Sequence, residues 1–162
     1  MYFNCSAKTV DASCTPNAGI SKFSFQTGKT HRLRLINSGS DGMQKFSIDD
    51  HTLTVIAVDF VPVVPYNTTV VTLGVGQRTD VLVKATGKPG EAYWMRSNFS
   101  QLCAAPPSLQ PYALAAIYYP GANQNARPNS IAYSYTQTNC LNVSTTYFYS
   151  HFVLEQDHEQ VF

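Results

Sequence analysis

Charged residues are scarce in this sequence, and it has no long uninterrupted apolar run. Lys, Arg, Asp and Glu make up 13% of the 162 residues and the formal net charge is +1, so no basic face is available to neutralise a nucleic-acid backbone. The longest apolar stretch, residues 55–64, is interrupted by Asp59 and Pro62 and is far shorter than the roughly 20 residues that a membrane span needs. We therefore expect neither nucleic acid nor a membrane as a partner.

Closely spaced metal-ligand motifs are also missing. The four cysteines include no Cys-x-x-Cys pair, which favours disulfides over a zinc or thioredoxin-type site. A blue-copper site needs Cys, His and usually Met together, but no Met follows Met95 and the first His after Cys140 is His151. The isolated histidines are His31, His51, His151 and His158. We therefore predict that the chain by itself binds no metal, and we expect His51 to be a polar turn residue.

Aromatic and β-branched residues are abundant instead. Ten Tyr and nine Phe accompany Val- and Thr-rich runs, which favours an all-β domain, and the length suits a single domain. The segments with strand character are 22–25, 31–37, 45–49, 52–60, 68–73, 79–85, 92–98 and 113–119. No helical period persists for three turns, so any helix should be a single turn inside a loop.

The pattern within these segments predicts which residues reach the core. In the segment 31–37, leucines alternate with arginines, which places Leu33 and Leu35 inward and the arginines outward. Residues 55–58 and 113–117 are apolar at every position, as expected for strands covered on both faces near the centre of a sheet. The Pro- and Gly-containing stretch 121–140 is expected to be surface chain.

Sequons and cysteines together indicate an exported glycoprotein. An even set of cysteines suits an oxidising compartment, and Asn-x-Ser/Thr sequons matter only on the secretory route. The sequons begin at Asn4, Asn67, Asn98 and Asn142. Residues 1–20 contain no apolar signal-peptide core. We expect a secreted protein whose signal peptide lies upstream; otherwise the prediction of secretion is wrong.

Five short motifs occur in an order that resembles a known domain. They are Gly28–Asn37, Phe46–Ile56, Asp59–Val63, Val75–Val81 and Tyr93–Arg96. Over about residues 20–140 they resemble the second domain of ascomycete laccases and related multicopper oxidases. The resemblance implies a Greek-key β-sandwich of the cupredoxin (plastocyanin-like) type over residues 1–140, followed by an unassigned C-terminal tail, 141–162.

The resemblance also implies a function for a longer parent protein. Laccase-like enzymes remove single electrons from phenol-like compounds and reduce dioxygen to water with copper cofactors. Their copper ligands lie in the first and third domains, in His-x-His and His-Cys-His strings that this chain lacks. We therefore expect flanking cupredoxin domains of the same polypeptide as partners, a structural and substrate-pocket role for this chain, and no activity in the isolated chain.

Three residues are candidates for the substrate pocket by resemblance. Asp41 lies where laccases carry an acidic residue that accepts the phenol proton, although the composition of residues 38–42 also suits an ordinary turn. Asn98 and Phe99 follow a strand where the family also lines its pocket. Asn98 begins a sequon, however, and a glycan does not fit a tight pocket, so only one of its two roles can hold. The alternative role for Phe99 is plain core packing.

The cysteines suggest two local bridges. Cys103 with Cys140 matches a disulfide of the resembled domain, while Cys5 with Cys14 is inferred only from proximity in sequence. A different class of function also stays open. A stand-alone secreted β-sandwich that binds a partner or a carbohydrate fits the missing catalytic residues, because one fold supports many functions. Sequence flanking this chain separates the two hypotheses.

Overall fold

The computed structural model of the chain describes residues 19–103, 111–136 and 140, and within these ranges the regular secondary structure is almost entirely β-strand. The strands are β1 (Ser21–Ser24), β2 (Thr30–Ile36), β3 (Gln44–Ile48), β4 (Leu53–Val58), β5 (Val61–Thr68), β6 (Val71–Leu73), β7 (Arg78–Lys84), β8 (Ala92–Phe99) and β9 (Tyr112–Tyr118). One short 3₁₀ turn, η1 (Gln101–Cys103), is the single helical segment of the described residues. The prediction of an all-β domain is confirmed. No helix in these ranges is long and apolar enough to cross a membrane.

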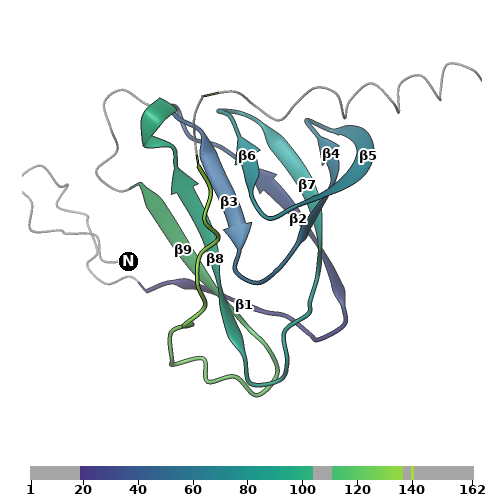
Figure 1. Cartoon of the computed structure of the whole chain (residues 1–162), viewed down its shortest axis with the longest axis vertical. Coiled ribbons are helices and arrows are strands. Elements are labelled where there is room, and N and C mark those ends of the chain that lie inside the picture. Colours follow the sequence, from purple (N-terminus) through teal and green to yellow (C-terminus); the bar gives the residue numbers. More distant parts are fainter. Residues whose placement is uncertain (1–18, 104–110, 137–139, 141–162) are drawn as a thin grey trace, which may run out of the picture.

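The strands form two sheets that pack face to face (Figure 1). Sheet A has the order β1-β9-β8-β3-β6, and sheet B has the order β2-β7-β4-β5. Strand β1 pairs with β9 in parallel, whereas the other pairs are antiparallel. Sheet B is covered by sheet A on one face and is open to solvent on its other face. Burial therefore alternates along a strand, as it does along β2.

The core lies between the sheets and follows the alternation of the sequence. Leu33 and Leu35 pack against it while the neighbouring arginines are exposed, as predicted. Strand β4 lies between β7 and β5, and Val55 is fully buried, so its predicted central position is confirmed. Strand β9 also has neighbours on both sides, but only its second half is buried, with Ala116 and Ile117 at the core and Ala113 exposed.

The predicted strand 52–60 is wrong in its extent, and a strand that the sequence did not suggest follows it. The chain turns at Asp59 and Phe60, and β5 then returns antiparallel to β4. The new strand contains Pro62 and Pro65, which lack the N–H that a central strand must donate. Because β5 is the edge of sheet B, both prolines are tolerated there. The prediction 68–73 merged the end of β5 with β6.

The stretch after β9 runs as a mostly exposed chain along sheet A (Figure 1, yellow-green), which confirms the expected surface segment for the part described. It is nevertheless anchored, because Pro128 is buried and Ser130 bonds to the backbone of β8. The tail, residues 141–162, lies outside the described residues.

Candidate functional site

Asp41 lies in the loop between β2 and β3, at the end of the sandwich that is uppermost in Figure 1. Its side chain is exposed, and its Oδ1 accepts a hydrogen bond of 2.7 Å from the backbone N–H of Gly42. That contact is the local turn bond expected of Asp, and it leaves the other carboxylate oxygen without a hydrogen bond from the described residues. The carboxylate therefore faces solvent from a shaped loop.

A buried amide holds this loop in place. The side chain of Asn37, only 5% exposed, donates to the carbonyl oxygens of Gly42 at 3.2 Å and Leu73 at 3.1 Å. Its Oδ1 accepts from the N–H of Gly39 at 3.1 Å. Loop positions and strand β6 are thus tied to one side chain. The role of Asn37 is not visible in the sequence, because nothing near it indicates that its partners lie up to 36 positions away.

The structure brings the Asp41 loop against Phe99. Strand β3 pairs with β8 so that Gln44 lies opposite Phe99, and the N–H of Ser100 donates to the carbonyl of Met43 at 2.8 Å. A methyl group placed on Gly42 would come within 2.1 Å of the Phe99 ring. The Phe99 ring therefore packs on Gly42, the residue next to Asp41.

Asn98 is on the other side of the sheet. Side chains alternate along β8, so Phe99 shares the core-facing side with Met95, whereas Asn98 shares the outer side with Arg96. The Asn98 amide donates to the hydroxyl of Tyr135 at 3.2 Å, in the surface segment. Of the three residues expected in the pocket, the structure brings together Asp41 and Phe99 and separates Asn98 from them.

An open hollow of about 440 Å³ lies beside this loop between the two sheets. Its walls combine apolar side chains with the polar groups of the loop. They include Leu35, Asn37, Gln44, Phe46 and Leu73. Neither Asp41 nor Phe99 lines it, so it adjoins the candidate site without being part of it.

A disulfide joins Cys103 to Cys140, with 5.5 Å between the two Cα atoms. It fixes η1, which begins two residues after Phe99, to the segment after β9. Cys5 and Cys14 lie outside the described residues, as do the sequons at Asn4 and Asn142. Asn67 is exposed on the edge strand β5.

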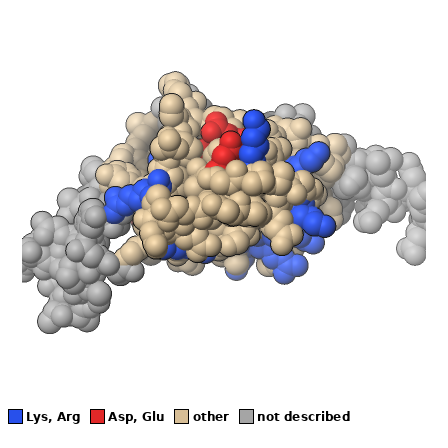
Figure 2. All heavy atoms as spheres, turned by 90° about the horizontal axis from the view of Figure 1, so that it is seen from below, with Lys and Arg blue, Asp and Glu red and all other residues tan. Residues whose placement is uncertain are grey.

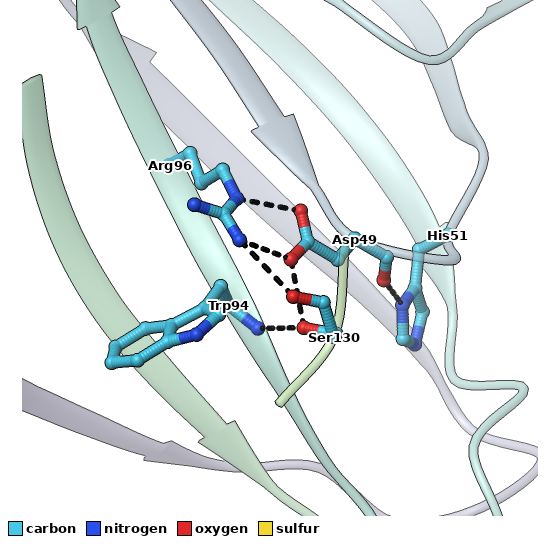
Figure 3. A network of polar contacts seen from close by, with 5 residues as sticks. All are labelled: Asp49, His51, Trp94, Arg96 and Ser130. Atoms are coloured by element: carbon cyan, nitrogen blue, oxygen red, sulfur yellow. Dashed lines mark hydrogen bonds and ion pairs between the residues drawn. The ribbon is translucent and has the colours of Figure 1, made fainter. Parts of the chain in front are cut away.

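A buried polar network occupies the lower half of sheet A (Figure 3). Arg96 donates to both carboxylate oxygens of Asp49, at 2.8 Å and 2.7 Å, and Asp49 is fully buried. The hydroxyl of Ser130 donates to the same carboxylate at 2.7 Å and accepts from the N–H of Trp94 at 2.9 Å. These contacts satisfy the buried charges, and the sequence analysis did not find them because the partners are up to 81 positions apart.

Comparison with known proteins gives the family. The family model "Multicopper oxidase" matches residues 3–122. The chain belongs to the multicopper oxidase family. It is 46% identical over 103 residues to Laccase-2 of Botryotinia fuckeliana, covering 64% of this chain and 17% of that protein. It is 35% identical over 129 residues to Laccase-1 of the same fungus, covering 78% of this chain and 23% of that protein. The chain thus spans about a fifth of the length of these relatives.

Solved structures of multicopper oxidases share the fold. The laccase from Botrytis aclada superposes with a TM-score of 0.75 at 37% identity, over 88% of this chain and 26% of that one. Fet3p, a multicopper oxidase that functions in iron import, superposes with a TM-score of 0.64 at 22% identity, over 82% of this chain and 25% of that one, which shows the fold alone. The expected β-sandwich of the cupredoxin type is therefore confirmed.

The described residues do not fit the copper that this family implies. Both ring nitrogens of His51 are engaged, Nδ1 with the carbonyl oxygen of Asp49 at 2.7 Å and Nε2 with the hydroxyl of Tyr119 at 2.6 Å. His31 is stacked on Phe25 with 4.0 Å between ring centroids. No group of three His, Cys, Asp or Glu side chains that could hold a metal occurs in the part of the chain that the structure describes. His51 follows the turn after β3, as expected, but it is a core residue, 1% exposed.

Several titratable groups outside the Asp41 loop have shifted pKa values. Burial, and then the hydrogen bond to Glu91, raise the pKa of Tyr93, and the same bond lowers the pKa of Glu91. Burial lowers the pKa of Lys45, whose ammonium donates to the hydroxyl of Thr72 at 2.7 Å.

Tyr93 and Glu91 border a second hollow of about 540 Å³ with Asp50, at the lower end. Figure 2 shows a small group of acidic side chains in the upper middle of this lower face, with a basic side chain directly beside it and others farther away.

Proposed function

We propose that this chain is the middle domain of a laccase-like multicopper oxidase. It contributes a substrate-facing carboxylate, while the copper cofactors are held by flanking cupredoxin domains of the same polypeptide. The observation that carries the proposal is the place of Asp41, an exposed carboxylate in a loop fixed by Asn37 and packed beside Phe99. The match to about a quarter of a solved laccase supports a parent with further domains.

The chemistry follows from the proton that a phenol must lose. A phenol in contact with Asp41 donates its O–H hydrogen bond to the carboxylate. As one electron leaves the ring for acceptors outside this chain, the proton passes to the carboxylate oxygen, so the product is a neutral phenoxyl radical. The high-energy phenol radical cation is avoided. In the parent, the electrons reduce dioxygen to water.

Phe99 is the second pocket residue of this proposal, because its ring packs on Gly42 next to Asp41. Asn98 projects from the opposite face of β8 toward Tyr135, which favours its role as a sequon over a place in the pocket. We further propose that the parent is secreted and glycosylated, which the exposed position of Asn67 and the disulfide at Cys103 support. The domain is proposed to occupy residues 1–140, with a tail at 141–162.

The test compares the parent with the isolated chain. The flanking coding sequence is determined, and the parent and this 162-residue chain are each produced through a secretory route and loaded with copper. We expect stoichiometric copper, an intense blue absorption and phenol-dependent oxygen uptake in the parent, and none of these in the isolated chain. Flanking sequence without His-x-His strings would contradict the proposal and favour a stand-alone binding module. An intense blue colour in the isolated chain would also contradict it.

A further inference from the structure

The end of the sandwich that carries Asp41 also carries exposed apolar side chains from sheet B. The register places Ile36 opposite Arg78 and Val58 opposite Val61, so the ends of β2 and β4 and the starts of β5 and β7 meet at this end. Phe60 is 83% exposed and Ile36 is 62% exposed. With Val75 and Arg78 they form what we call the Phe60 patch. A single exposed apolar residue is ordinary, but a group of this kind on one end marks an interaction site.

The backbone that displays Phe60 is strained. Val58 pairs with Val61, which leaves Asp59 and Phe60 as a tight hairpin turn with φ of +48° and +70°. Turns with two positive φ angles favour Asn-Gly or Asp-Gly, because glycine adopts this conformation without a steric cost. A bulky aromatic residue there is an outlier, and such strain persists where surrounding structure enforces it.

Neighbouring groups hold the turn in place. The carboxylate of Asp59 accepts from the N–H of Arg78 at 2.8 Å, and the N–H of Asp59 donates to the carbonyl of Arg78 at 2.9 Å. The Arg78 guanidinium lies 5.6 Å from the centroid of the Phe60 ring and donates to the carbonyl of Gly76 at 2.6 Å. The ring is therefore pre-positioned at the surface, with little conformational entropy left to lose on binding.

We propose that the Phe60 patch docks against a flanking cupredoxin domain of the same polypeptide, an inference that rests on the function proposed above. The solved laccase has a chain about four times as long as the part matched here, since the match covers 26% of it, so a covering domain is available. An aromatic anchor with an adjacent Arg is typical of protein interfaces. The one acid of the turn, Asp59, already accepts the backbone N–H of Arg78, so this carboxylate oxygen keeps its hydrogen-bond donor when the patch is covered.

Replacing Phe60 by glycine tests the proposal through a reversal of sign. In the isolated chain, Phe60→Gly relieves the strained φ and is expected to raise the midpoint of thermal unfolding. In the copper-loaded parent, the same change removes the anchor and is expected to lower the midpoint and speed proteolysis between domains. Ile131→Ser is the matched control, because Ile131 is equally exposed at 83% but lies outside the patch. It is expected to move neither midpoint.

Hydroxyl-radical labelling of the unchanged proteins gives a second readout that does not depend on a variant. Phe60 is expected to be oxidised about tenfold more slowly in the parent than in the isolated chain. Equal labelling in an active, copper-loaded parent overturns this inference and leaves the proposed function intact. Self-association of the parent that Phe60→Gly abolishes overturns it in favour of a second copy. A parent without flanking cupredoxin domains overturns the proposed function and this inference together.

Discussion

The two ends of this sandwich differ in which side chains they bury and which they expose. At the lower end, Asp49 is fully buried and each carboxylate oxygen has a partner in Arg96 or Ser130 (Figure 3). At the upper end, Asp41 is exposed and Phe60 is held outward on a strained turn. This difference indicates that the groups that stabilise the domain and the groups available for recognition lie in separate regions. The enclosed contacts of Asp49 contribute to folding, whereas Asp41 and Phe60 are presented to something outside this chain.

The largest expected effect comes from breaking the buried ion pair between Asp49 and Arg96. Asp49→Ala leaves the Arg96 guanidinium partly buried without its carboxylate, and breaking a buried ion pair costs about 3–5 kcal/mol. We expect a loss of this size in the free energy of unfolding of the isolated chain, measured by urea denaturation. Asp80→Ala is the control, since its partner Arg32 is half exposed, and we expect at most about 1 kcal/mol. Equal losses in the two variants would remove the distinction between closed and exposed ion pairs.

The disulfide ties the upper end to the surface segment, so removing it is the next largest change. The Cys103–Cys140 bridge, with a sequence separation of 37, restricts the unfolded chain. It is therefore expected to contribute about 2–4 kcal/mol to the free energy of unfolding. The double variant Cys103→Ser/Cys140→Ser should lower the unfolding free energy by that amount. Peptide mapping of the unreduced wild type is the check, and a crossed pairing with Cys5 or Cys14 would contradict it.

Two glycines with nearly the same φ angle test how the upper end is packed. Gly42 and Gly76 have φ of +75° and +76°, but only Gly42 meets another side chain, the Phe99 ring. Gly76→Ala is expected to cost about 1 kcal/mol for the positive φ alone. Gly42→Ala should cost a further 1–3 kcal/mol, roughly the cost of overpacking, because Phe99 must move. If the two variants unfold at the same urea concentration, Phe99 does not pack on the Asp41 loop.

Local pattern predicted most of the strands. The Leu–Arg alternation of β2 and the apolar run of β4 depend on neighbours in sequence. Strand β2 lies where expected, and β4 begins near its predicted start. The turn at Asp59 and Phe60 was missed because a strained aromatic turn breaks the usual preference for glycine, so residues 52–60 looked like one strand.

The sites needed the tertiary structure. Asp41 was found through resemblance, since its turn composition alone predicts nothing catalytic. Asn37 ties the loop to Leu73 on another strand. In the Asp49 network, the partners Arg96 and Ser130 are separated from Asp49 by 47 and 81 positions in the sequence. Side chains alternate along any strand, but the sequence does not say which face of β8 meets the Asp41 loop. That choice separates Asn98 from Phe99.

The most direct test of the account is the effect of Asp41→Asn on the copper-loaded parent. Because an amide cannot accept the phenol proton, we expect phenol oxidation to fall by about 10²-fold or more and its pH profile to change. Oxidation of a one-electron donor without an ionisable proton should stay close to wild type. Asp50→Asn, which changes an exposed acid at the lower end, is the control and should alter neither rate. Equal loss toward both donors, or no loss toward either, would contradict the account and leave Asp41 as an ordinary turn residue.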